Sequence, residues 1–64
     1  GFSDRRLKSN IVRIGTHRSG FPLYSYEIFG KPDIGVMADE VAAVRPDAVV
    51  MHKSGFMMVN YGAL

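Results

Sequence analysis

Pro22-Leu23-Tyr24-Ser25-Tyr26-Glu27-Ile28 has the clearest strand pattern in this chain of 64 residues. Larger apolar side chains recur at every second position, which is typical of a strand that packs one face on a core. The pattern places Tyr24, Tyr26 and Ile28 on one face and Leu23, Ser25 and Glu27 on the other. An aromatic pair on a strand usually packs within its own sheet. One hypothesis for these aromatic residues is instead a carbohydrate-binding tip formed by Tyr24, Tyr26 and His17.

The segment after this strand predicts a turn and then a helix. Gly30-Lys31-Pro32-Asp33 has the composition of a turn. The apolar run Ile34–Met37 leads into a helix at about 38–44, which Pro46 ends because Arg45 before it is disfavoured in a helix. Met37, Val41 and Val44 repeat at helical spacing and predict one buried stripe, while Asp39 and Glu40 suit the positive end of the helix dipole.

The two ends of the chain complete the predicted fold. At the C-terminal end, the β-prone runs 48–53 and 56–61 flank Ser54-Gly55, which predicts a hairpin with a two-residue turn. At the N-terminal end, we expect a helical turn over 4–9, a strand over 10–14 and a loop over 15–20. The predicted class is α+β: a small antiparallel sheet with a C-terminal hairpin, one principal helix and a short N-terminal helical turn.

Composition narrows the classes of function. Eight Lys and Arg residues against six Asp and Glu residues give a net charge of only +2, too weak and too dispersed to predict a nucleic-acid surface. No apolar run approaches the roughly 20 residues of a membrane span. The chain has no cysteine, and its two histidines have no partners at metal-ligand spacing, so neither a metal site nor a cofactor is predicted.

One stretch, Ser3-Asp4-Arg5-Arg6-Leu7-Lys8, holds a hydroxyl and an amine that could react together. Fifth neighbours on a helix lie about 140° apart, so the two groups can meet only if Ser3 is in extended chain before a turn. The pair would then form a Ser-Lys dyad, with Lys8 as general base. A lysine pKa near 10.4 must fall for that role, by burial or by neighbouring cations such as Arg5 and Arg6. The alternative is an N-cap at Ser3 or Asp4 beside a solvated basic face.

Three ordered stretches carry a resemblance that covers nearly the whole chain. They are Ser3-Asp4-Arg5-Arg6-Leu7-Lys8-Ser9-Asn10-Ile11, then Ile34–Val41 with Arg45–Val49, and finally Gly55-Phe56 with Val59–Leu64. The chain resembles the peptidase S74 family, the C-terminal intramolecular chaperone domain of phage endosialidases and tail fibres. The resemblance implies a domain that helps an upstream fibre to form a trimer and then cuts itself off before the motif serine.

Carried over to this sequence, the resemblance implies that Ser3 is the nucleophile, Lys8 the base and Phe2-Ser3 the bond that is cut. Asp4, Arg5 and Arg6 would support the site. Residues 1–2 would be a remnant of the upstream chain and residues 3–64 the chaperone domain. The implied partners are the domain's own upstream fibre chain and two further copies in a homotrimer, with no nucleic acid and no membrane. The implied location is a tail fibre or tailspike precursor of a virion, or the cytoplasm of the bacterial host during assembly.

Two departures from the family pattern accompany the resemblance. Asp39 stands where the family more often has Gln, and we expect little effect from this change. The sequence also stops at Leu64, where longer members continue into a helix that forms a trimeric coiled coil. A separate hypothesis is that the same fold serves as a non-catalytic structural cap or folding nucleus of a fibre or surface protein, with the dyad inert.

Overall fold

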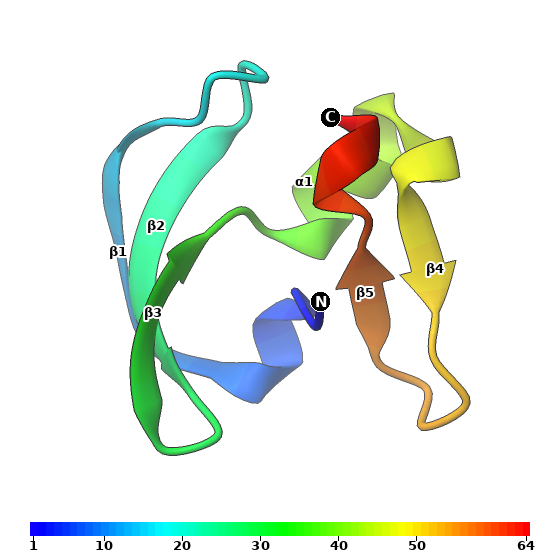
Figure 1. Cartoon of the computed structure of the whole chain (residues 1–64). Helices are drawn as coiled ribbons and strands as arrows, with labels where there is room; N and C mark the ends of the chain where they lie inside the picture. Colours follow the sequence, from blue (N-terminus) through cyan, green and yellow to red (C-terminus); the bar gives the residue numbers. More distant parts are fainter.

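Two small antiparallel sheets and one helix make up the computed structural model, which describes residues 1–64 (Figure 1). The first sheet has the order β1 (Lys8–Thr16), β2 (Pro22–Ile28), β3 (Lys31–Gly35), and the second pairs β4 (Val49–Met51) with β5 (Met57–Val59). The helix α1 (Ala38–Val44) follows β3, and three 3-10 turns are η1 (Arg5–Leu7), η2 (Pro46–Ala48) and η3 (Tyr61–Ala63). The predicted α+β class is confirmed.

The central strand β2 has the predicted faces, because Tyr26 and Ile28 are buried while Glu27 is exposed. The predicted turn at 30–33 is wrong. The chain reverses over two residues, Phe29 and Gly30, since Ile28 pairs directly with Lys31. Pro32 lies in β3, which is an edge strand, and there a missing backbone N–H costs no ladder hydrogen bond.

The helix α1 has the predicted bounds, and its C-cap is Arg45 just before Pro46. Its predicted stripe is wrong at one position. Met37 and Val41 are fully buried, but Val44 is 70% exposed. Three residues turn a helix by about 300°, so Val44 lies about 60° from Val41 and falls outside the narrow face that this short helix buries.

The strand β1 is longer than predicted and already begins at Lys8, so the N-terminal turn is only η1. The second hairpin also differs from the prediction. Met51 pairs with Met57, which leaves a five-residue loop, His52-Lys53-Ser54-Gly55-Phe56, in place of a two-residue turn.

That loop has a close counterpart between β1 and β2. His17-Arg18-Ser19-Gly20-Phe21 has the same residue pattern, and both loops make the same contacts. In each loop the histidine N–H donates to the phenylalanine carbonyl, at 2.7 and 2.9 Å, and the serine N–H donates to histidine Nδ1, at 3.1 Å in both. The glycine has a positive φ in both loops, 96° and 88°. The chain therefore uses one loop motif twice.

Two apolar clusters form the core. One joins α1 to the second sheet and contains Phe21, Val36, Ala38, Val41, Ala48 and Val59. The other lies on the inner face of the first sheet and contains Tyr26, Ile28 and Met37. The only buried polar or charged side chains in the protein are those of Ser3, Asp4 and Lys8. None of the helices has the length and apolar character that a membrane crossing requires.

Candidate active site

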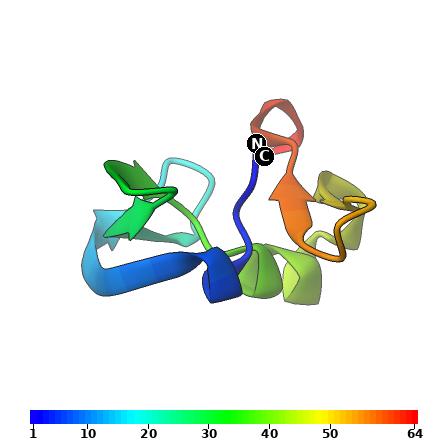
Figure 2. The ribbon, with the colours of Figure 1, turned by 90° about the horizontal axis from the view of Figure 1, so that it is seen from below.

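The first three residues run antiparallel to β5 and extend the second sheet. Gly1 and Val59 exchange two hydrogen bonds, of 3.0 and 2.9 Å, and the Ser3 N–H donates to the Met57 carbonyl at 3.1 Å. Figure 2 shows this N-terminal segment passing between the two sheets. The bond between Phe2 and Ser3 is therefore held in an extended backbone, as the prediction for the dyad required.

Ser3 is buried, with 1% of its surface exposed, and it links β5 to the helix. Its carbonyl accepts a 2.9 Å hydrogen bond from the Ala38 N–H, the first amide of α1. Its hydroxyl Oγ has no hydrogen-bond partner and is the only buried side-chain polar atom in that condition. A buried hydroxyl normally finds a partner, so Ser3 Oγ is an exception in this protein.

Asp4 turns the chain away from β5. Its carboxylate caps η1 by accepting the Arg6 N–H at 2.9 Å, and it also accepts the Met57 N–H at 3.0 Å. The Arg6 guanidinium adds bonds of 3.1 and 3.0 Å. These bonds, that of the Arg6 side chain above all, hold the pKa of Asp4 well below its usual range. Asp4 is thus an N-cap, as the alternative interpretation of this stretch stated, and it also fixes Ser3 against β5.

Lys8 points into the protein from the first position of β1. Its ammonium Nζ donates to the Val36 carbonyl at 2.7 Å and lies 4.0 Å from the centre of the Tyr26 ring and 3.8 Å from Met37 Sδ. No carboxylate forms an ion pair with it. Burial, and next the charge of Arg5, lower the pKa of Lys8 to about 8. The amine is therefore partly neutral near physiological pH.

The residues Ser3 and Lys8 both bond to one short backbone segment. The Ser3 backbone carbonyl accepts the Ala38 N–H, and the Lys8 side chain donates to the Val36 carbonyl, two residues earlier. No hydrogen bond joins Ser3 Oγ to Lys8 Nζ, and the amine donates to the Val36 carbonyl. Direct proton transfer between them requires the two atoms to come within hydrogen-bond distance.

A comparison with known families matches residues 3–50, which are 48 of the 64 residues, to the peptidase S74 family, described as the chaperone of endosialidase. The chain belongs to this family. Searches of curated proteins and of solved structures gave no significant match. The matched range includes Ser3, Lys8 and the whole segment Val36–Ala38, which bonds to the Ser3 carbonyl and to the Lys8 amine.

In this S74 domain the two arginines next to the site have different roles. Arg5 forms an ion pair of 3.3 Å with Asp39, and both side chains are nearly half exposed. Arg6 is bound to Asp4, to the Gly55 carbonyl at 2.8 Å and to the face of Phe56. Of the two cations that were predicted to crowd Lys8, only Arg5 contributes to its lowered pKa.

Tyr61 is a contact of the site that the sequence analysis did not identify. Its hydroxyl accepts the Val36 N–H at 3.0 Å, so the Val36 residue is held by Tyr61 at its nitrogen and by Lys8 at its carbonyl. A Cβ at Gly35 would collide with the hydroxyls of Tyr61 and Tyr26. Tyr61 lies in the last of the three stretches that carry the resemblance. It is far from Lys8 in the sequence, so no sequence pattern predicts that both contact Val36.

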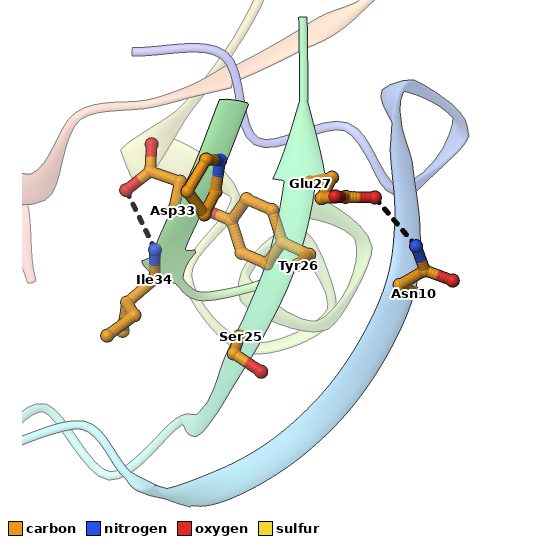
Figure 3. A pocket seen from close by; sticks show the side chains of 7 residues that line it. Asn10, Ser25, Tyr26, Glu27, Asp33 and Ile34 are labelled. Carbon is orange, nitrogen blue, oxygen red and sulfur yellow. Dashed lines mark hydrogen bonds between the residues drawn. The ribbon is translucent and has the colours of Figure 1, made fainter. Parts of the chain in front are cut away.

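The residues of the predicted sugar platform do not share a surface. Tyr24 donates to the Glu40 carboxylate at 2.9 Å, Tyr26 is 5% exposed, and the His17 ring faces Tyr61. A hollow lies instead on the first sheet, where Asn10 donates to Glu27 at 2.6 Å (Figure 3). Its lining consists of Asn10, Ser25, Tyr26, Glu27, Pro32, Asp33 and Ile34, and includes neither Ser3 nor Lys8.

Proposed function

We propose that this domain is a C-terminal intramolecular chaperone of a phage-type tail fibre or tailspike, and that it releases itself by cutting the Phe2-Ser3 bond. The proposal rests on a buried Ser3 hydroxyl without a hydrogen-bond partner and, in the same motif, a buried Lys8 amine whose pKa is lowered to about 8. Such a pair has the properties of a nucleophile and its general base.

The proposed reaction is a shift of the Phe2 acyl group from nitrogen to oxygen. Lys8 takes the proton of the Ser3 hydroxyl as Oγ attacks the Phe2 carbonyl carbon. The C–N bond then breaks, the Ser3 nitrogen takes up a proton, and an ester joins Phe2 to Oγ. Water hydrolyses the ester and leaves a carboxylate on Phe2 and a free amine on Ser3. The Phe2 carbonyl oxygen accepts no hydrogen bond from the protein, and the Ser3 N–H is held by Met57.

Folding would control this reaction, because the site is assembled from distant parts of the sequence. The segment 1–3, the start of β1, the residues before α1 and strand β5 must all be in place before Ser3 and Lys8 are buried together. Burial supplies both the orientation and the lowered pKa. The cut would then follow folding of the homotrimer with its upstream fibre chain, during assembly of the virion in the host.

The direct test is intact mass over time for a chain with about thirty residues upstream of Ser3, compared with Ser3→Ala and Lys8→Met. We expect the parent to split into two fragments at Phe2-Ser3 and both variants to stay whole while folded, as judged by circular dichroism. Cleavage that continues in Ser3→Ala would contradict the assigned nucleophile.

The second candidate function is a structural cap with an unreactive dyad. One observation favours it: Lys8 is already satisfied by Val36, Met37 and Tyr26 and makes no bond to Ser3. If the domain is a structural cap, we expect the folded parent chain to stay intact indefinitely in the same experiment, also when it is assembled into the homotrimer.

A further inference from the structure

The aromatic ring of Phe2, the residue before the proposed cut, lies between two other rings. Phe29 contacts it edge to face at a centroid distance of 5.8 Å, and His52 does so at 4.9 Å. Phe29 comes from the turn between β2 and β3, and His52 from the loop between β4 and β5. Figure 1 shows that both reversals lie at the same lower end of the molecule, one on each sheet.

The backbone at Phe29 is unusual for its residue type. Phe29 and Gly30 both have positive φ, 52° and 73°, as the central residues of a type I′ turn do. Asn or Gly normally occupies the first of these positions, because a bulky side chain is strained in the left-handed region. Its side chain is also 67% exposed, so burial in the core does not explain the phenylalanine. The contact with Phe2 explains why a phenylalanine stands at this position.

The His52 ring is fixed by its own loop rather than by Phe2. Its Nδ1 accepts the Ser54 N–H at 3.1 Å and lies 2.8 Å from the Ser54 hydroxyl. The same two contacts orient His17 in the equivalent loop, where no part of the upstream segment is present. The ring of His52 is therefore held in position before the upstream chain arrives.

We infer that Phe29 and His52 form an aromatic clamp that recognises the side chain before the cut bond and makes the domain specific for an aromatic residue there. This inference rests on the proposed cleavage at Phe2-Ser3. The clamp fixes the side chain while the hydrogen bonds of Gly1 and Ser3 with β5 fix the backbone on either side, so together they hold the Phe2 carbonyl in one place. It follows that Phe2→Tyr retains recognition and Phe2→Ala loses it.

The cleavage test uses two substitutions that keep the turns intact. Phe29→Asn gives the Asn-Gly sequence that a type I′ turn favours. His52→Asn keeps a side-chain oxygen to accept the Ser54 N–H. Each is expected to slow cleavage by about three- to tenfold, the range for loss of an aromatic pair. Val44→Asn is the control, because Val44 is an apolar residue about as exposed as Phe29 and lies far from Phe2 in the sequence. This variant is expected to leave the cleavage rate unchanged. An unchanged rate in both clamp variants overturns the inference.

A second arm separates the clamp from the chemistry. In chains that also carry Ser3→Ala, urea unfolding is measured for Phe2→Ala, Phe29→Asn and the double variant. The inference predicts that Phe29→Asn lowers the urea midpoint by one amount in the chain with Phe2 and by a different amount in the chain with Phe2→Ala. Equal shifts of the midpoint in the two chains overturn the inference. If the parent chain is folded but never cut, the proposed function fails, and this arm still decides whether Phe29 holds Phe2.

Discussion

Lys8 is a buried ammonium whose neighbours are a carbonyl, a sulfur atom and an aromatic face, with no carboxylate in contact. The neutral form of this amine is favoured more than it would be for a lysine in water, because the charged form has lost its solvent and gained no counter-ion. Arg5 adds a repulsive charge, whereas Asp33, Asp39 and Asp4 oppose the shift from a distance.

The rate of self-cleavage should therefore follow the protonation of Lys8. Only the neutral amine can take the serine proton, so we expect the rate constant to rise about tenfold per pH unit below 8 and to level off above about pH 9. The measurement is fragment formation by mass over pH 6–10. Lys8→Arg, which stays protonated throughout, is the control and should be inactive at every pH. A flat profile in the parent would exclude Lys8 as the base.

Stability should depend on pH in the same region. The folded pKa of Lys8, about 8, lies below its unfolded value near 10.4, so the unfolded chain binds more protons between these two values. The free energy of unfolding of the uncleavable Ser3→Ala chain should therefore rise with pH across this window. Urea unfolding at pH 8 and pH 10 measures the rise, and Lys8→Met should remove it.

The burial of Ser3 and Lys8 and the contacts around them could not be predicted from the sequence, which only suggested the two residues as a candidate pair. Ser3 and Lys8 stand in one short motif, and the spacing argument correctly required Ser3 to be in extended chain. The ring under the ammonium comes from Tyr26, and the carbonyl that it bonds to comes from Val36, 28 residues away in the sequence. Contacts of this kind arise only from tertiary packing. The contacts of Arg6 with Gly55 and Phe56 were missed for the same reason, whereas its bonds to Asp4 are local and join residues two positions apart.

At the scale of elements, β3 ends where two tyrosine hydroxyls meet the backbone. Gly35 is buried and leaves no space for a Cβ beside Tyr61 and Tyr26. Its φ lies outside the left-handed region, so the need for glycine at this position is steric rather than conformational.

Gly35→Ala should lower the free energy of unfolding by about 1–3 kcal/mol, the usual cost of an overpacked position. Gly15→Ala in β1 is a matched control, because no atom lies within 4 Å of the added carbon and its φ is also ordinary. The control should be neutral or slightly stabilising. Thermal or urea unfolding of the two variants measures the difference, and equal effects would contradict this account of Gly35.

Elements with strong local signals were predicted well. Alternation set the faces of β2, and Pro46 set the end of α1. The hairpins were predicted less well. The turn predicted at 30–33 begins one residue too late, because a phenylalanine is not expected at the φ of 52° that Phe29 adopts. The five-residue loops were missed because the similarity of residues 17–21 to residues 52–56 was not used. The His-x-Ser-Gly-Phe pattern was visible there.

The whole molecule has few buried apolar side chains, nine in all, and several large apolar residues remain exposed. Val12, Ile14 and Ile34 of the first sheet are at least half exposed. A core this small gives a single copy limited stability.

The proposed homotrimer therefore predicts that stability depends on protein concentration. Because dilution favours separate chains, we expect Tm to fall by roughly 5 °C for each tenfold dilution of the chain with its upstream segment. Scanning calorimetry at several concentrations, with sedimentation to count the copies, measures this. A constant Tm and a single monomeric species at all concentrations would refute trimer formation by this segment.

The pairing of the first residues with β5 also has a mechanical consequence. Gly1 lies opposite Val59, so chain that precedes Gly1 and chain that follows Val59 leave the same end of this short ladder. After the proposed cut, Ser3 and its bond to Met57 stay with the domain, so tension on the upstream chain would load only the Gly1–Val59 pair. Pulled from this end, the two hydrogen bonds of the pair would be peeled open rather than sheared. Under the proposed cleavage, a fibre could therefore pull away from its chaperone at low force.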